Sequence, residues 1–161
     1  MKAVFLDIDG VLNNAYSKTR APSGAIGIDG DKVKRLRKIV EETGAKLVLT
    51  SSWKTDTGED RDYMVRKLKR ERLHVLMHTV DERWNRWEGI RRWIERYGRD
   101  LEAYVILDDE FFEDYYSDPG KEILRPEVKD HLVKTEFFDE DGGLRDAHVE
   151  MALRILKGQE V

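Results

Sequence analysis

Short apolar runs alternate along the chain with stretches in which apolar residues recur every three or four positions. The runs are bounded by polar or glycine-containing segments, which is the pattern of buried strands. They predict five strands, at residues 2–6, 45–53, 74–80, 102–110 and 130–135. The helically spaced stretches predict four helices, one that begins near Asp29 or Asp31 and ends at Gly44, and others at 60–72, 84–97 and 144–156.

Strands that alternate with helices from end to end indicate a parallel sheet that is covered by helices on both faces. We therefore expect a three-layer Rossmann-like α/β domain with a central, mostly parallel five-stranded sheet. No linker or change of composition divides the chain, so residues 1–161 are expected to form a single domain.

Composition narrows the possible classes of function. The chain holds 29 basic and 33 acidic residues, a net charge of −4, which argues against nucleic-acid or membrane binding through bulk charge. It has no cysteine, which excludes disulfides, thiolate metal sites and cysteine nucleophiles and fits a cytoplasmic location. No apolar run reaches membrane-spanning length, and the first residues are typical of a strand, not of a signal peptide.

Polar side chains lie at the carboxyl ends of three of the predicted strands. They form three pairs: Asp7 and Asp9, Thr50 and Ser51, and Asp108 and Asp109. In open parallel sheets, ligands bind beyond these ends, so the pairs are expected to converge on one pocket if their strands are neighbours. Four carboxylates that close together cannot all stay ionised without a cation, and oxygen-only ligands suit a hard ion such as Mg²⁺.

A magnesium ion beside a free carboxylate suggests phosphoryl transfer. Because the ion neutralises charge on the phosphate, an aspartate can attack phosphorus and become an aspartyl-phosphate. A second carboxylate two residues along the chain can protonate the leaving oxygen and later activate water. Each motif alone has a plainer interpretation: Asp-x-Asp-Gly occurs in turns and metal loops, and Thr50 and Ser51 can cap a loop. Their common position at strand ends favours catalysis.

The segments FLDIDGVLN, VLTSSW and VILDDE, in this order, resemble the motifs of the haloacid dehalogenase (HAD) phosphohydrolase superfamily. The resemblance covers nearly the whole chain. TGAKLVLTSSWK and the C-terminal segment are most similar to a small, capless HAD subgroup that is associated with RNA-repair proteins. The resemblance implies a Mg²⁺-dependent phosphatase.

By this resemblance, Asp7 is expected to be the nucleophile and a metal ligand. Asp9 is expected to be the general acid and base, with its backbone carbonyl on the metal. Thr50 and the backbone amide of Ser51 would hold the phosphoryl group. The remaining metal ligands would be Asp108 and Asp109, the latter through water or by orienting a cation.

The resemblance also requires a lysine or arginine, because the transition state carries charge that the metal alone cannot balance. Arg86, at the head of the predicted 84–97 helix, matches the spacing of the subgroup. Arg83 and Lys54 are the alternatives.

Many members of the superfamily select substrates with an inserted cap domain. Here only about 20 residues separate the first motif from the first helix, too few for a folded cap. We expect an open site for a bulky substrate, such as a nucleic-acid end, a phosphoprotein or a glycolipid phosphate. Small phosphates, including nucleotides, are also possible substrates if residues 14–28 or an oligomer form a lid. Residues 110–118 are expected to form a lip beside the metal strand.

Residues 61–100 hold 12 basic and 7 acidic residues interleaved with tryptophans, a composition that can bind single-stranded nucleic acid. A non-catalytic nucleic-acid-binding module is therefore the alternative function. The helical spacing of Trp87 and Trp93 favours packing on the sheet for these two. Trp84 is a candidate for the mouth of the site, and Trp53 for contact with the leaving group of a substrate.

Overall fold

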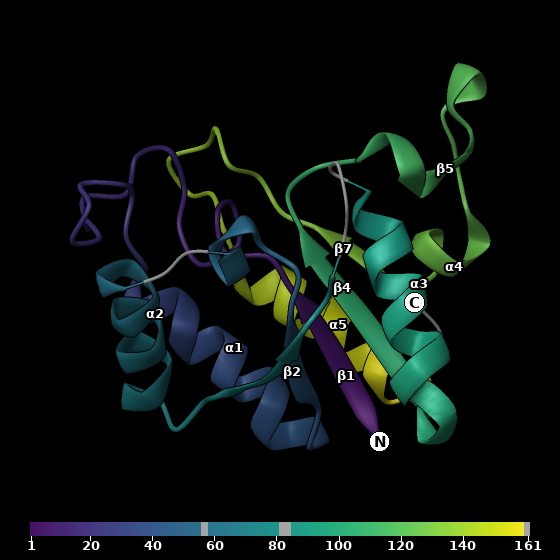
Figure 1. Cartoon of the computed structure of the whole chain (residues 1–161), viewed down its shortest axis with the longest axis horizontal. Coiled ribbons are helices and arrows are strands. Elements are labelled where there is room, and N and C mark those ends of the chain that lie inside the picture. Colours follow the sequence, from purple (N-terminus) through teal and green to yellow (C-terminus); the bar gives the residue numbers. More distant parts are fainter. Residues whose placement is uncertain (56–57, 81–84, 160–161) are drawn as a thin grey trace.

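A five-stranded sheet forms the centre of the computed structural model, which describes residues 1–55, 58–80 and 85–159 (Figure 1). Its strands, in the spatial order β3-β2-β1-β4-β7, are β1 (Lys2–Leu6), β2 (Lys46–Leu49), β3 (Val75–His78), β4 (Ala103–Asp108) and β7 (Leu132–Lys134). All neighbouring strands are parallel, so the sheet that the sequence predicted as mostly parallel is parallel throughout.

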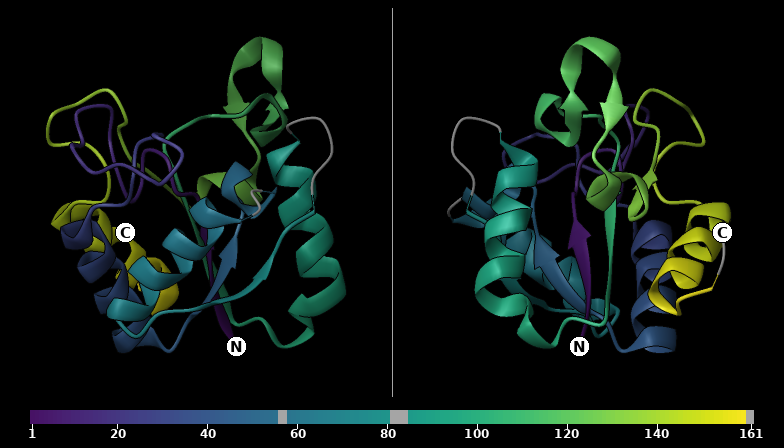
Figure 2. Two further views of the ribbon diagram at one scale, coloured as in Figure 1. Left: turned by 60° about the vertical axis from the view of Figure 1, so that its left-hand side comes forward. Right: turned by 90° about the vertical axis from the view of Figure 1, so that its right-hand side faces the viewer.

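Helices cover both faces of the sheet, which confirms the three-layer α/β fold (Figure 2). The α-helices are α1 (Gly30–Thr43), α2 (Glu59–Arg70), α3 (Arg86–Tyr97), α4 (Pro126–Lys129) and α5 (Asp146–Leu156). Short 3₁₀ turns include η1 (Ser52–Thr55) and η3 (Glu113–Tyr115). The four predicted helices are present with small differences at their ends, whereas the short α4 was not predicted. Residues 81–84 lie outside the described part of the chain.

Two apolar layers hold the helices to the sheet. In β1, Val4 and Leu6 face the layer with α1, α2 and α5, while Ala3 and Phe5 face the layer with α3. Because β1 is buried on both faces, its sequence is a nearly continuous apolar run without alternation. Trp93 of α3 packs edge-to-face on Phe5, with ring centroids 5.4 Å apart, and this confirms the packing role expected from its helical spacing.

The loops at the carboxyl ends of the strands carry structure that the sequence pattern did not predict. Strands β5 (Tyr116–Asp118) and β6 (Ile123–Leu124) form a separate antiparallel pair that rises above the sheet (Figure 2). Elements this short bury too few residues for a periodic pattern to be visible. Residues 14–28 form an irregular excursion with one isolated bridge, between Arg20 and Ile26, and α2 and β3 fill the interval between β2 and α3 as expected.

No helix within the described residues has the length and apolar character that crossing a membrane requires.

Candidate active site

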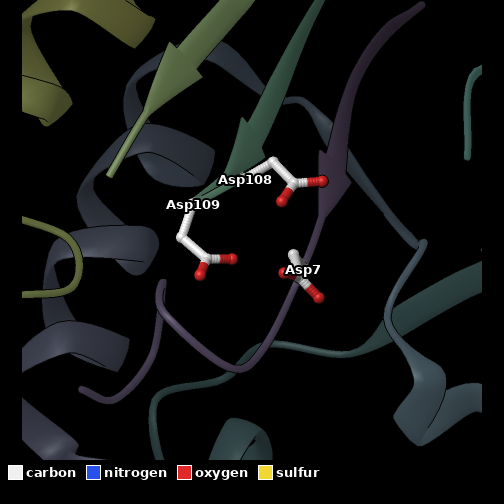
Figure 3. A group of neighbouring side chains, drawn as sticks. All are labelled: Asp7, Asp108 and Asp109. Carbon is white, nitrogen blue, oxygen red and sulfur yellow. The ribbon is translucent and has the colours of Figure 1, made fainter. Parts of the chain in front are cut away.

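Three aspartates converge beyond the carboxyl ends of the two central strands (Figure 3). Asp7 directly follows β1 and donates its backbone N–H to the Leu107 carbonyl of β4 at 3.0 Å. This pairing brings Asp7 beside Asp108 and Asp109, and one carboxylate oxygen of each lies within 4.8 Å of the other two. Because β1 and β4 are parallel neighbours, the convergence that the sequence predicted for these three residues is present.

Gly10 allows this close approach. Its φ of +86° lies in the left-handed region, and a Cβ at this position would lie 2.3 Å from Cγ of Asp109. The Thr135 hydroxyl, from the segment after β7, donates to the Gly10 carbonyl and fixes the turn. Only glycine therefore lets the chain leave β1 while Asp109 stays in the cluster.

Arg86 joins the aspartates from the first residue of α3. Its Nη1 lies 3.1 Å from Oδ2 of Asp108 and 3.5 Å from Oδ1 of Asp7, and it donates to the Thr50 hydroxyl at 3.3 Å. The side chain is buried, and its guanidinium carbon lies 4.5 Å from the centroid of the Phe112 ring. Of the three candidate cations, Arg86 is therefore brought to the cluster. Arg83 and the side chain of Lys54 lie outside what the structure describes.

Segment 110–118 contacts both the helix that carries Arg86 and the aspartate cluster. Oδ2 of Asp114 accepts hydrogen bonds from the backbone N–H groups of Trp87 and Glu88 at 2.6 and 3.2 Å, so it caps the N-terminus of α3 from a distant segment. The Tyr115 hydroxyl, fully buried, donates to Oδ2 of Asp108 at 3.1 Å. The predicted lip is thus also a wall that holds the helix carrying Arg86. Neither contact was predicted, and the only signal was the mixture of aromatic and acidic residues directly after VILDDE.

Asp9 stands apart from the three clustered carboxylates and is held by two side chains. Asn13 donates its Nδ2 to Oδ1 of Asp9 at 2.9 Å, and the Trp53 indole donates to Oδ2 at 3.1 Å. Asn13 is itself fixed, because its Oδ1 accepts from the Gly10 N–H and its Nδ2 also donates to the Gly27 carbonyl. Asn13 was not predicted as a site residue, although it closes the FLDIDGVLN motif, and Trp53 was predicted to contact the substrate and not Asp9.

Thr50 and Ser51 follow β2 and are both almost fully buried. The Thr50 N–H donates to the Leu6 carbonyl at 2.9 Å, which sets Thr50 beside the end of β1 and within reach of Arg86. The Ser51 hydroxyl accepts the Trp53 N–H at 3.2 Å, so this side chain does cap the following turn. Ser51 therefore lies at the end of β2, as the site role requires, and its side chain also caps the following turn.

Burial dominates the electrostatics of the cluster. It raises the pKa of Asp7, an effect that the nearby Arg86 guanidinium opposes. It raises the pKa of Asp108 well above its usual range, with the Asp7 carboxylate adding to the shift, and it raises the pKa of Asp109 to about 7 for the same two reasons. Without a cation, burial therefore favours the protonated forms of these three carboxyl groups.

The donor set fits a hard divalent cation. Three carboxylates and one arginine leave two negative charges uncompensated when all are ionised. Magnesium binds oxygen ligands at about 2.0–2.1 Å in octahedral geometry, which places its ligand atoms about 3–4 Å apart. Oxygens of Asp7, Asp108 and Asp109 that lie within 4.8 Å of one another need only a small movement to reach that spacing.

The pKa of Asp109 predicts how the metal-free protein responds to pH. Since its pKa is raised in the folded state, the unfolded chain loses this proton first, above about pH 4, and the folded state only near pH 7. Its contribution to the free energy of unfolding is therefore expected to fall as pH rises through that interval. Thermal unfolding in EDTA should show Asp109→Asn gaining stability over the parent, by a few degrees more at pH 7.5 than at pH 5. If the difference in melting temperature between Asp109→Asn and the parent does not widen with pH, the raised pKa is contradicted. In saturating Mg²⁺ at pH 7.5 the parent should instead be the more stable of the two proteins.

Comparison with known proteins agrees with this geometry. The family model described as the HAD domain in Swiss Army Knife RNA repair proteins matches residues 3–149, a span that contains all of the strand-end residues above. No curated protein matches the chain. Membership of a HAD family supports a HAD-type phosphohydrolase in general terms, and it confirms the resemblance to RNA-repair-associated HAD domains that the motifs indicated. The chain therefore belongs to the family of HAD domains in Swiss Army Knife RNA repair proteins.

Proposed function

We propose that this protein is a Mg²⁺-dependent phosphatase that hydrolyses phosphomonoesters through an aspartyl-phosphate on Asp7. The observation that carries the proposal is the cluster of Asp7 and Asp108, both buried, with the half-buried Asp109, and with Arg86 against the two buried carboxylates. Placing three carboxylates together, two of them buried, beside one arginine is unfavourable for folding, and such groups are retained where they bind a cation or react.

The metal would be held by the side chains of Asp7, Asp108 and Asp109 and by the backbone carbonyl of Asp9. When bound, Mg²⁺ would neutralise the charge of the phosphate, so that an anionic nucleophile can approach phosphorus. Arg86, the Thr50 hydroxyl and the Ser51 backbone amide would bind the non-bridging oxygens, whose charge grows in the transition state.

In the first step, a carboxylate oxygen of Asp7 forms a bond to phosphorus while the bond from phosphorus to the leaving oxygen breaks. Asp9 gives its proton to that oxygen, so the product leaves as an alcohol. In the second step, Asp9 takes a proton from water, whose oxygen attacks phosphorus and releases inorganic phosphate and the Asp7 carboxylate. The hydrogen bonds from Asn13 and Trp53 support this role, because they restrict the Asp9 side chain to one orientation.

The substrate in this proposal is a phosphorylated small molecule, such as a nucleotide, or a nucleic-acid end. The pocket that contains Asp7 and Arg86 is only about 210 Å³, which suits a phosphoryl group and leaves the rest of the substrate outside it. The alternative of a non-catalytic nucleic-acid-binding module gains less support. Trp87 and Trp93 are buried, and Arg91 and Arg92 are paired with Glu88, so within the described part of α3 these rings and these cations are not presented together to a nucleic-acid strand.

Turnover of an aryl phosphate with and without metal tests the proposal. We expect hydrolysis in Mg²⁺ that EDTA lowers by at least about 100-fold and that added Mg²⁺ restores, since the metal supplies several kcal/mol of charge stabilisation. Release of inorganic phosphate is the measurement. Hydrolysis at an equal rate in EDTA would contradict metal dependence, and its absence with every phosphomonoester tested would contradict the proposed function.

A further inference from the structure

A second pocket adjoins the one that contains the aspartate cluster. Its volume is about 320 Å³, and the four residues that line it but not the first pocket are Ala25, Ile26, Trp53 and Asp60. The two pockets share Asp9, Ser52 and Phe137 in their walls. Asp9 therefore lies at the boundary between them.

The position of Asp9 determines what the second pocket can hold. A general acid must lie within hydrogen-bond reach of the oxygen that it protonates. If the phosphoryl group binds beside Asp7 and Arg86 in the first pocket, the leaving oxygen must lie near Asp9, at the boundary. The group attached to that oxygen then extends into the second pocket.

Apart from Asp9, Asp60 and Ser52, the residues that line this pocket are apolar or aromatic. Ala25 and Ile26 come from the excursion between β1 and α1, and Phe137 comes from the segment after β7. The 320 Å³ volume lies at the lower end of the range for small-molecule sites, about the size of one ring system with a sugar or a short substituent. Such walls favour a flat group with apolar surface.

Asp60 supplies the charge of the pocket. Its carboxylate is held at the start of α2 by Ser23, whose N–H donates to Oδ1 at 3.0 Å and whose hydroxyl donates to Oδ2 at 2.5 Å. Within the described residues, no basic side chain lines the pocket. A negative group placed there would face Asp60 and Asp9 together, whereas hydroxyl or amino groups could donate hydrogen bonds to Asp60.

We infer that this second pocket is a leaving-group subsite for a flat, uncharged alcohol, of the class of aryl groups and nucleosides, and that Asp60 selects against leaving groups that carry a further phosphate. The inference rests on the proposed phosphatase function, since it assigns the other half of the same substrate. The subsite would favour nucleoside monophosphates and aryl phosphates as substrates. It would disfavour sugar bisphosphates and nucleic-acid strands with an adjacent phosphodiester.

The experiment compares kcat/KM for a nucleoside monophosphate and for the corresponding nucleoside bisphosphate in the parent protein and in charge variants. Expressing each result as a ratio of the two substrates removes effects on folding and on the chemical step that both substrates share. Asp60→Lys is expected to shift the ratio toward the bisphosphate by about 10-fold, because reversing one charge within several Å of a phosphate changes the interaction by about 1–2 kcal/mol. Asp60→Asn, which removes the charge without reversing it, is expected to give a smaller shift in the same direction.

Asp62→Lys is the matched control. Asp62 belongs to the same turn of α2 and changes the net charge equally, but it is exposed and does not line the pocket. Its ratio is expected to stay within about twofold of the parent, since exposed charges that are farther from the ligand are screened.

The outcomes distinguish the inference from the proposal on which it rests. If an aryl phosphate is not hydrolysed in a Mg²⁺-dependent way, the proposed function fails. If it is hydrolysed but Asp60→Lys and Asp62→Lys change the ratio equally or not at all, the subsite inference is overturned while the phosphatase remains. A parent protein that prefers the bisphosphate would overturn it as well.

Discussion

Asp7→Asn is expected to lower phosphatase turnover by about 1,000-fold or more and, at the same time, to stabilise the metal-free protein. An amide has nearly the shape of the carboxylate, but it is not a nucleophile toward phosphorus and it is a weak metal ligand. Loss of a group that forms the covalent intermediate removes the whole pathway and not one interaction, which is why the expected effect is large.

The gain in stability follows from the electrostatics of the cluster. Asp7 is buried beside Asp108 and Asp109, and burial raises the pKa of its carboxyl group. Removing one of three clustered negative charges relieves repulsion in the folded state, so thermal unfolding in EDTA at pH 8 is expected a few degrees higher than in the parent. A variant that has simply misfolded would lose both activity and stability, so the opposite signs identify a chemical effect.

Asp9→Asn is the matched control for the covalent step. It keeps Arg86 and the three clustered carboxylates, Asp7 among them, but it lacks the group that protonates the leaving oxygen in the first step and activates water in the second. With an aryl phosphate the leaving group departs without that proton, so the second step is the one that is lost. The mass of the acid-quenched protein is therefore expected to show a phosphoryl adduct that accumulates in Asp9→Asn and never forms in Asp7→Asn. Turnover of Asp7→Asn at the rate of the parent would exclude the mechanism outright.

The convergence of the aspartates could be predicted from the sequence because it depends only on strand order. Asp7 and Asp108 end apolar runs that must be buried strands, and parallel neighbours bring their carboxyl ends to one edge. This prediction needs no side-chain geometry. It requires only that β1 and β4 are adjacent, as they are in the spatial order of the sheet.

The residues that orient the reactive groups could not be predicted in the same way. Asp114 caps α3, Tyr115 donates to Asp108, and Asn13 holds Asp9, and each contact depends on the path of a loop. Periodicity reports burial and not loop path, so these contacts left no repeating signal.

The identity of the cation in the site could not be predicted from the sequence for the same reason. The sequence offered three cations, Arg83 and Arg86 at the head of the predicted 84–97 helix and Lys54 directly after VLTSSW. Arg86 reaches the aspartates because α3 begins at that residue, and Asp114 holds the first backbone N–H groups of the helix. The position of Arg86 thus depends on a contact between segments far apart in the sequence, since 27 positions separate Trp87 from Asp114.

Arg86→Met is expected to cost the metal-free protein about 3–5 kcal/mol of unfolding free energy at pH 8 and to lower kcat/KM by at least about 100-fold. Methionine fills a similar volume and keeps a contact with Phe112, but it leaves Asp7 and Asp108 without the nearby positive charge. Chemical denaturation with and without Mg²⁺ measures the first effect. Mg²⁺ is expected to stabilise the variant more than the parent, because the ion then compensates charge that Arg86 normally compensates.

Arg86→Lys separates charge from shape at this position. A single nitrogen, Nη1, makes the contacts with Asp7, Thr50 and Asp108, so an ammonium group can replace them, although the shorter side chain loses the stacking on Phe112. We expect Arg86→Lys to keep kcat/KM within about 10-fold of the parent, whereas Arg86→Met does not. Equal losses of kcat/KM in the two variants would show that the planar guanidinium is required, and no loss in either variant would show that Arg86 has no role in the site.

Because the pKa of Asp108 is already raised well above its usual range, protonation of this carboxyl at low pH removes part of the charge repulsion in Arg86→Met. The stability difference between Met and Lys at position 86 must therefore grow as the pH rises.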